Sequence, residues 1–202
     1  ARIGPVLRDR GELDLVTDGI RTLRERGTGA ERQRRAVAVE HDLVAAVEAI
    51  LKGGHEIAHH GFLHEHPREL PADEEAHWLD RGIEVILRAT GQRPRGWRAP
   101  LYNFSHRSAD LLVARGFRYD ASLMGDDQPF LLDTRAGRLV ERPSHWGLDD
   151  WPQYVQSMDL DYMMPIRAPE QGLETYRQEF EAAHAYGGLW VPVVHPFATG
   201  RL

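Results

Sequence analysis

The sequence contains no cysteine, so disulfide bonds and thiolate chemistry are excluded and any bound metal must use nitrogen and oxygen ligands. No apolar run reaches the roughly 18 residues that a membrane-spanning helix requires. The first residues, Ala1–Pro5, lack both an initiator methionine and the apolar core of a signal peptide. We therefore predict a cytoplasmic protein with no membrane partner, whose N-terminus is incomplete or processed.

An excess of positive charge is also missing. Lys and Arg number 25 against 31 Asp and Glu, which gives a net charge of −6 and an isoelectric point near 6.0. A chain of this charge is a poor ligand for nucleic acids and anionic membranes. Apolar residues make up 42% of the 202 residues, which suits a globular domain with a sizeable core. We predict a single domain over residues 1–202 and no nucleic-acid partner.

Aromatic residues are absent from the first part of the chain. Every Trp, Tyr and Phe lies at or after Phe62, and residues 8–35 are rich in Arg, Glu, Asp and Gly. We identify no convincing buried strand there, because the apolar stretch Leu13–Val16 is short and flanked by acidic residues. We interpret residues 1–42 as atypical and residues 43–202 as the regularly patterned part of the domain.

The patterned part predicts short strands that alternate with helices. Leu43–Leu51 has apolar residues at helical spacing and ends at Gly53-Gly54, a typical helix terminator. Further helices are predicted over about residues 71–90, 105–115 and 169–186, and extended segments over about 56–58, 96–100, 117–120, 139–141 and 189–195. This alternation predicts an α/β fold with a mostly parallel sheet or barrel.

Five of the eleven histidines lie within His55–His66. Within this cluster, His60 and His64 are four residues apart, a spacing that places two side chains on one face of a helical turn. Two imidazoles on one face form half of a typical site for Zn²⁺ or a related divalent ion. The alternative interpretation is a solvated, histidine-rich loop that binds no ion.

Three further segments carry polar side chains, and the first and last of them lie at predicted strand ends. They are Arg98–Tyr102, Trp146–Asp150 and Val194–Pro196. In an α/β barrel, residues at the carboxyl ends of the strands converge on one site. Together with the histidine pair, these segments supply a cation, carboxylates and another histidine, which are the groups used in metal-assisted hydrolysis.

Taken in order, these segments resemble the motifs of the polysaccharide deacetylases, the proteins of carbohydrate esterase family four that carry a NodB homology domain. Within that superfamily, the chain is most similar to the branch of peptidoglycan-deacetylase-like proteins and cyclic imide hydrolases. The resemblance covers roughly residues 43–202. It is carried by Gly54–Glu65, Arg98–Pro100 with Asn103–Ser105, Tyr119–Met124, Trp146–Asp150, and His195-Pro196 with Gly200-Arg201.

The resemblance implies a deformed (β/α) barrel with one divalent metal ion, usually zinc. It also implies that His60 and His64 ligate the ion, which activates a water molecule and polarises a carbonyl group. The backbone N–H of Leu101 would help to stabilise the oxyanion. His195 would act as the general acid that protonates the leaving nitrogen.

The resemblance assigns supporting roles to further residues. Arg98 would hold the carboxylate of the catalytic base, and Asp149 or Asp150 would orient the general acid. Tyr102 and Trp146 would line the substrate pocket. The alternatives are a structural arginine, a helix cap or turn at the two aspartates, and core packing for the two aromatic residues.

One motif of the family has no counterpart. The family's first motif, an Asp-rich strand end, supplies a carboxylate ligand and the catalytic base, and no segment of this sequence matches it. We therefore expect a barrel that lacks its N-terminal strand. An open sheet edge favours association, so we predict poor solubility or self-association of this chain. The resemblance separately implies a homo-oligomer, because members of this branch are generally oligomeric. A shifted reading frame upstream of Leu43 is a further hypothesis that would explain both the unusual composition and the missing motif.

Three functions remain open at this point. The first is a metal-dependent hydrolase of C–N amide bonds, which removes acetyl groups from an amino-sugar polymer or opens a cyclic imide or ureide. The second is a catalytically inactive remnant that binds metal or carbohydrate, and the third is an α/β domain with incidental histidines. The first function predicts an amino-sugar or small-molecule substrate.

Overall fold

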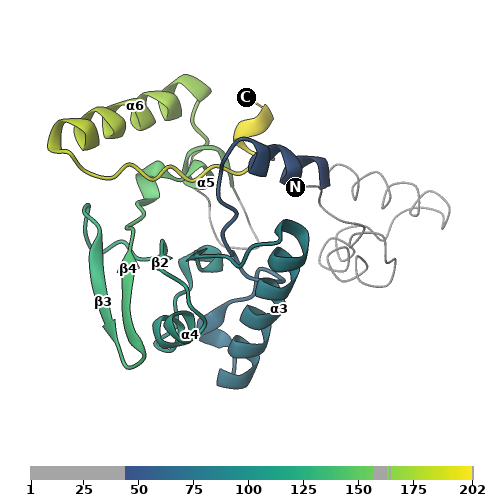
Figure 1. The fold of residues 1–202 in the computed structure, drawn as a ribbon. Coiled ribbons are helices and arrows are strands. Elements are labelled where there is room, and N and C mark those ends of the chain that lie inside the picture. Colours follow the sequence, from purple (N-terminus) through teal and green to yellow (C-terminus); the bar gives the residue numbers. More distant parts are fainter. Residues whose placement is uncertain (1–43, 157–162, 164, 202) are drawn as a thin grey trace.

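A four-stranded sheet organises the part of the chain that the computed structural model describes, residues 44–156, 163 and 165–201 (Figure 1). The strands are β1 (Gly96–Trp97), β2 (Tyr119–Asp120), β3 (Phe130–Thr134) and β4 (Gly137–Glu141). Their order in the sheet is β1-β2-β4-β3. β1, β2 and β4 are parallel, and β3 pairs with β4 as an antiparallel hairpin.

Two further segments add parallel pairing beyond these strands. His59 forms a parallel bridge with Trp97 of β1, and Asp149 forms one with Val193. The N–H of His59 donates to the carbonyl oxygen of Gly96 at 2.9 Å. Because parallel strands share the direction of their carboxyl ends, the segments that follow them leave the sheet at one edge, where ligands bind in open α/β sheets.

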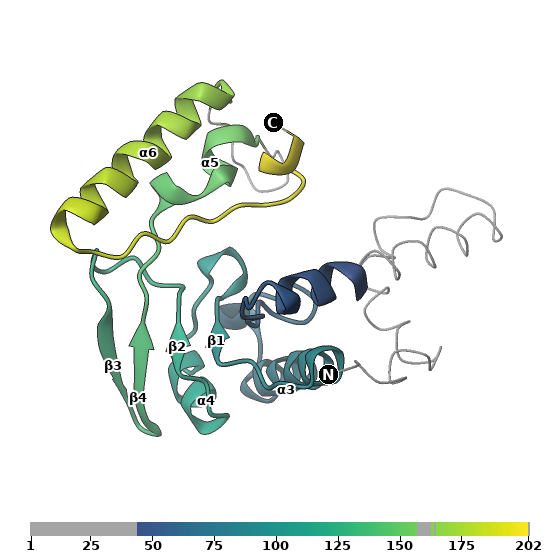
Figure 2. The same cartoon turned by 45° about the horizontal axis from the view of Figure 1, so that its top comes forward.

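Helix α3 (Ala72–Thr90) has the signals of a well-defined helix. Pro71 precedes it, acidic residues occupy its first turn, and Gly91 ends it in the left-handed conformation (φ 71°). Together with α4 (Ser108–Ala114), it packs against the sheet (Figure 2). The buried core consists of Leu79, Ile83, Trp97, Ala99, Leu112, Phe117 and Leu139.

The C-terminal part lies beyond the carboxyl ends of the parallel strands (Figure 2). It contains η4 (Trp146–Leu148), α5 (Asp150–Tyr154), α6 (Pro169–Tyr186) and η5 (Thr199–Arg201). Helices α5 and α6 approach closely at Gly172, where a Cβ atom would lie 2.0 Å from Oη of Tyr154. After α6, the chain returns past α5 (Figure 1), which brings the segment around His195 to the start of α5.

Most of the predicted helices are found. Residues 44–52 are helical, and the helices predicted over 71–90, 105–115 and 169–186 correspond to α3, α4 and α6. The strand predicted over residues 189–195 is wrong as a continuous strand, because only Val193 forms a bridge. Pro192 beside it has no N–H to donate to a ladder.

Two expectations concern residues outside this description. The missing N-terminal strand and the shifted reading frame both fall on residues 1–43, which lie outside the described part of the chain. Within that described part, no helix combines the length and the apolar composition needed to cross a membrane.

Candidate active site

His60 and His64 lie in a loop and not on the predicted helical turn. The loop turns at Gly61 (φ 77°) and at His64 itself (φ 60°). The two imidazole rings nevertheless meet, with their centroids 5.2 Å apart and their planes at 76°. The predicted helix is therefore wrong, whereas the proximity of the two rings is present.

The carboxylate of Glu65 holds this loop in its turn. Its oxygens accept hydrogen bonds from the N–H of Phe62 at 2.9 Å and from the N–H of Leu63 at 2.8 Å. A Cβ atom at Gly61 would lie 2.8 Å from Cγ of Pro100, so glycine is required there. Local side-chain bonds of this kind compete with helix formation, which explains why the histidine spacing does not produce a helix.

A hydrogen bond fixes the orientation of His60. Its Nδ1 lies 2.9 Å from the carbonyl oxygen of Arg98. A carbonyl can only accept, so Nδ1 carries the proton and Nε2 keeps a free lone pair. Burial is the main cause that lowers the pKa of both His60 and His64, and His195 lowers both pKa values further. A neutral imidazole with one nitrogen fixed and the other free is the form that ligates a metal ion.

The neighbouring His59 has a structural role. Its side chain is 1% exposed, its Nε2 lies 3.2 Å from the carbonyl oxygen of Leu79, and its Nδ1 accepts from the N–H of Gly61. The ring fits against α3 only because position 82 is glycine, since a Cβ atom there would lie 2.0 Å from Nε2. Burial lowers the pKa of His59 to about 4. Both of its ring nitrogens are occupied, so it cannot ligate an ion without losing a bond.

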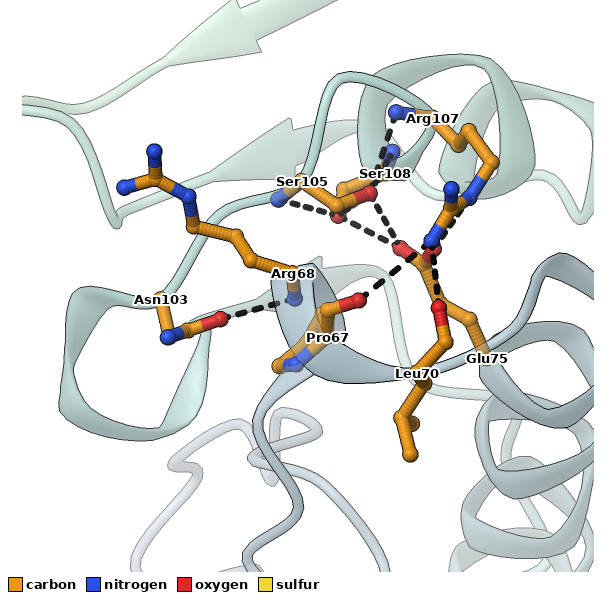
Figure 3. Close-up of polar contacts among 8 residues, drawn as sticks. All are labelled: Pro67, Arg68, Leu70, Glu75, Asn103, Ser105, Arg107 and Ser108. Carbon is orange, nitrogen blue, oxygen red and sulfur yellow. Dashed lines mark hydrogen bonds and ion pairs between the residues drawn. The ribbon is translucent and has the colours of Figure 1, made fainter.

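A buried polar network anchors the segment that follows the histidine pair (Figure 3). The carboxylate of Glu75, on α3, accepts from the hydroxyl groups of Ser105 and Ser108 at 2.7 and 2.8 Å. Arg107 donates from Nε to the same carboxylate at 2.8 Å and from Nη2 to the carbonyl oxygen of Leu70 at 2.8 Å. Glu75 is only 6% exposed, so its carboxylate requires these partners.

The same region joins two loops of the site. The short helix η2 (Pro67–Glu69) follows the histidine loop, and η3 (Pro100–Tyr102) follows β1. The N–H of Arg68 in η2 donates to Oδ1 of Asn103, directly after η3, at 2.7 Å (Figure 3). The histidine loop and the segment that carries Leu101 are therefore fixed relative to each other.

The segment after β1 has a backbone conformation that non-glycine residues rarely adopt. Leu101 has φ 51° and ψ 26°, and Tyr102 has φ 55°. Among the described residues, the only other non-glycine residue with positive φ is His64. All three are residues that the sequence assigned to the site, and such strained positions gather at functional sites.

The turned backbone leaves one donor unused. The N–H of Leu101 makes no hydrogen bond to any group in the described part of the chain. The N–H of Tyr102, in contrast, donates to the carbonyl oxygen of Ala99 at 3.0 Å. A fixed, unpaired N–H beside a binding site is a suitable donor to a developing oxyanion.

Arg98 is held by neutral acceptors. Its Nε donates to the carbonyl oxygen of Ala121 at 2.8 Å, and its Nη2 donates to the hydroxyl of Ser144 at 2.8 Å. The guanidinium also lies 5.8 Å from the ring centroid of Tyr102. In the described residues no carboxylate forms an ion pair with it, so its expected role of holding a catalytic base stays a prediction.

Asp150 and His195 form a closely coupled pair. Nδ1 of His195 lies 2.5 Å from Oδ1 of Asp150, and the backbone N–H of His195 donates to Oδ2 at 2.8 Å. The hydroxyl of Thr199 also donates to Oδ2. Burial raises the pKa of Asp150, but the hydrogen bonds from Thr199 and His195 outweigh it, so the pKa lies below its usual value. Asp150 thus accepts a hydrogen bond from the protonated Nδ1, which leaves Nε2 of the half-exposed His195 free.

Asp149 has a different set of partners. It caps α5 by accepting from the N–H of Trp151 at 2.8 Å, and it accepts from the hydroxyl of Tyr102 at 2.6 Å. Burial and this bond raise the pKa of Tyr102. The ring of Trp146 lies edge-on to the ring of Tyr102, with centroids 4.7 Å apart, and is 49% exposed. The two aromatic residues are therefore placed together beside the aspartates.

Two groups of side chains are candidates to bind a metal ion. Asp149, Asp150 and His195 have possible ligand atoms within 4.8 Å of one another. Their carboxylate oxygens already accept the hydrogen bonds described above, so this group fits an oriented acid or base better than an ion site. The His60–His64 pair has a free Nε2 and fits better, but no Asp or Glu among the described residues joins it in a three-ligand group.

Some residues of this region were not predicted from the sequence. Asp120 and Glu141 are completely buried at the ends of β2 and β4, and Thr199 and Glu65 support the predicted residues. A usable signal existed for the first two. Both are acidic residues at the end of a predicted extended segment. The rule that polar residues at strand ends converge on one site, which selected Arg98 and His195, would have selected them too.

Comparisons with known proteins show similarity to the polysaccharide deacetylases. Residues 27–119 match the family model of "Polysaccharide deacetylase". A peptidoglycan deacetylase from Helicobacter pylori is 32% identical over 170 residues, which cover 72% of this chain and 53% of that protein. A peptidoglycan deacetylase-like protein from Gibberella zeae is 43% identical over 127 residues, which cover 51% of this chain and 38% of that protein.

A solved structure extends the likeness to three dimensions. A Mycobacterium smegmatis protein assigned to the polysaccharide deacetylases superposes with a TM-score of 0.73 at 40% identity, covering 80% of this chain and 57% of that one. The chain thus spans about half the length, or less, of the curated relatives that it matches. The family match begins at residue 27, inside the segment that the sequence pattern predicted to be atypical.

Proposed function

Because this chain is a member of the polysaccharide deacetylase superfamily, we propose that it is a metal-dependent hydrolase that removes the N-acetyl group from an amino-sugar polymer. The family predicted from the motifs is confirmed, and so is its α/β fold. The hydrolysed bond would be an amide C–N bond. The names of the relatives favour a peptidoglycan-type amino sugar as substrate over a cyclic imide or ureide.

One observation carries this proposal. His195 is held at Nδ1 by Asp150 and is close enough to His60 and His64 to lower the pKa of both. Its free Nε2 can therefore donate a proton to a leaving nitrogen held beside the histidine pair. The buried carboxylate fixes the tautomer and the orientation of the imidazole, as in other histidine–carboxylate pairs.

His60 and His64 would hold the metal ion, for which zinc is the proposed identity. The Nε2 lone pair of His60 is free because its Nδ1 is committed to the Arg98 carbonyl. When bound, a divalent ion would polarise the substrate carbonyl and lower the pKa of water. A carboxylate ligand and the catalytic base would come from outside the described residues, in agreement with the missing first motif.

Backbone and aromatic groups would complete the site. The unpaired N–H of Leu101 would donate to the carbonyl oxygen as negative charge develops on it. Tyr102 and Trp146 would form one wall of the substrate pocket, since their rings pack together and Trp146 is half-exposed. Arg98 would position the base. Oligomerisation, which the sequence suggested, stays a prediction.

The test is a comparison of two reactions on one preparation. Release of acetate from an N-acetylated chitooligosaccharide and opening of a cyclic imide would be measured with zinc added, for the intact chain and for His195→Ala. We expect the intact chain to release acetate and His195→Ala to release none. The control variant Asp133→Asn, which changes an exposed residue outside the site, should release acetate like the intact chain. Activity only on the imide would support the alternative hydrolase. Absence of both activities would support the inactive remnant.

Metal content provides an independent readout. Inductively coupled plasma mass spectrometry should find about one zinc per chain, and both His60→Ala and His64→Ala should lower the content. A two-histidine site without its carboxylate binds weakly, so the measurement should be made at several zinc concentrations. Equal zinc content in the intact chain and both variants would contradict the assigned ligands.

A further inference from the structure

Two acidic side chains face each other below the candidate site. Asp120 ends β2 and Glu141 ends β4, and the two residues are register partners in the parallel sheet. Both are completely buried, with 0% exposure. No Lys, Arg or His in the described part of the chain forms an ion pair with either carboxyl group. The proposed reaction uses neither residue.

The hydrogen bonds of the pair are unequal. Asp120 accepts from the hydroxyl of Ser122 at 2.7 Å and from the N–H of Ser122 at 3.0 Å. Glu141 accepts at Oε1 from the N–H of Leu123 at 3.0 Å, but its buried Oε2 has no donor among the described residues. A bare carboxylate oxygen in this position would be costly.

A single proton bound by the two carboxyl groups would supply the hydrogen bond that Oε2 of Glu141 lacks. Two adjacent buried carboxyl groups without a cation cannot both be ionised, and their side chains are in hydrogen-bonding contact. The Ser122 donors favour the ionised form of Asp120, so the proton belongs on Oε2 of Glu141. Burial is the largest cause that raises the pKa of Glu141, to about 9, and Asp120 is the next. Burial also raises the pKa of Asp120. Among the charged side chains of the described residues, Asp120 has the largest effect on the pKa of Glu141.

The pair connects directly to the segment that carries Leu101. Ser122 donates its hydroxyl proton to Asp120, and the same oxygen accepts from the N–H of Ala99 at 2.8 Å. The carbonyl of Ala99 then accepts from the N–H of Tyr102. One side chain, that of Ser122, therefore links the carboxyl pair to the turn that contains the unpaired N–H of Leu101.

We propose that Asp120 and Glu141 share one proton, with Glu141 as donor, and that the pair acts through Ser122 to position the oxyanion-binding turn at Leu101. The shared proton is a property of the fold alone. The positioning role rests on the proposed hydrolase function. Both residues are positioning residues, since neither touches the place where substrate would bind.

The proton itself can be observed by infrared spectroscopy. At neutral pH, the intact chain should show the carbonyl band of a buried protonated carboxyl group. Glu141→Gln should remove this band. Asp133→Asn, which replaces an exposed carboxylate of β3 in the same sheet, should leave it in place. Absence of the band from the intact chain, or its persistence in Glu141→Gln, would overturn the shared proton.

The positioning role can be tested by amide hydrogen exchange in residues 98–102. Ser122→Ala breaks the path to Ala99, whereas Asp120→Asn weakens it by replacing one of the two acceptor oxygens with an NH2 group, so exchange there should accelerate about tenfold in Ser122→Ala and less in Asp120→Asn. Glu141→Gln is the conservative substitution, because its amide N–H replaces the carboxyl O–H and still donates to Asp120. In Glu141→Gln, the amides of residues 98–102 should exchange as slowly as in the intact chain, whereas in Glu141→Leu they should exchange faster. Should Asp120→Asn fail to fold, Ser122→Ala carries the test.

Kinetics separate this inference from the proposed function. In an active enzyme, Ser122→Ala should lower kcat about tenfold with little change in KM, because an oxyanion donor acts mainly in the transition state. If the chain is inactive but shows the infrared band and the expected exchange pattern, the proposed hydrolase function is refuted, whereas the shared proton of Asp120 and Glu141 is supported. Unchanged exchange in both Asp120→Asn and Ser122→Ala would overturn the positioning role.

Discussion

A single hydrogen bond determines which ring nitrogen of His195 is available for proton transfer. Its Nδ1 is committed to Asp150, so only Nε2 remains for proton transfer. The neighbouring rings of Trp151 and Phe197, with centroids 5.6 Å from the imidazole, restrict its position further. The residue is therefore placed to exchange one proton at one atom.

Replacement of Asp150 tests this limit. Asp150→Asn keeps the shape of the side chain but removes the carboxylate that accepts the hydrogen bond from Nδ1 of His195 and fixes its tautomer. We expect kcat for acetate release to fall by about a hundredfold or more, with the variant still folded. Initial rates and circular dichroism would check this. A variant with the intact rate would show that Asp150 is only a helix residue.

Gly61 tests the geometry of the histidine loop. Gly61→Ala places a Cβ atom 2.8 Å from Pro100 at φ 77°, whereas Gly91→Ala adds a Cβ atom in open space at φ 71°. Both variants carry backbone strain of about 1 kcal/mol, and only the first adds a clash of about 1–2 kcal/mol. Urea denaturation should show the larger loss for Gly61→Ala. Equal losses would mean that the loop tolerates the contact.

At the scale of elements, the sequence predicted the right neighbours by a partly wrong route. The spacing of His60 and His64 suggested a helical turn, but the rings meet in a loop held by Glu65. Periodicity cannot identify such a loop, because a carboxylate that binds nearby N–H groups leaves no repeating pattern. The rule of strand ends selected Arg98 and His195, and parallel strands do fix where their carboxyl ends lie, but the roles assigned to these two residues stay predictions.

The sequence could mark Asp120 and Glu141 individually as strand-end residues, but it could not predict that they form a pair. Asp120 and Glu141 meet only because β2 and β4 become neighbours with β3 outside them. Strand order is a property of the whole sheet, and no local pattern specifies it. The arrangement of Glu75 with Arg107 depends in the same way on contacts between distant elements.

The Glu75 network offers a test at this scale. Arg107→Ala leaves a buried carboxylate without its cation and frees the carbonyl of Leu70. We expect the free energy of unfolding to fall by roughly 2–3 kcal/mol, less than for a fully buried pair because Arg107 is partly exposed. Arg177→Ala, which removes exposed helix ion pairs on α6, should have little effect. Equal denaturation midpoints for the two variants would contradict the anchoring role.

For the whole molecule, the proton on Glu141 should appear in the pH dependence of stability. The folded chain keeps this proton up to pH about 9, whereas an ordinary glutamate loses it near 4.5. Between these values, folding takes up a proton, so the free energy of unfolding falls as pH rises, by at most about 1.4 kcal/mol per unit. Above pH 9 this contribution is constant.

Glu141→Gln isolates the effect. The variant has no group to titrate at this position, so its stability should fall less with rising pH than that of the intact chain. The difference should be visible in urea denaturation at pH 5, 6.5 and 8. Asp133→Asn serves as the reference with an unchanged slope. Parallel pH profiles for Glu141→Gln and the intact chain would mean that Glu141 is ionised in the fold.

The left-handed turn at Leu101 has a practical consequence for the molecule as a whole. The proposed contribution of this residue is made by its N–H, while its side chain is 39% exposed. The sequence contains no cysteine, so Leu101→Cys would introduce a unique thiol beside the candidate site. A fluorophore attached there would report ligand entry directly, without depending on turnover.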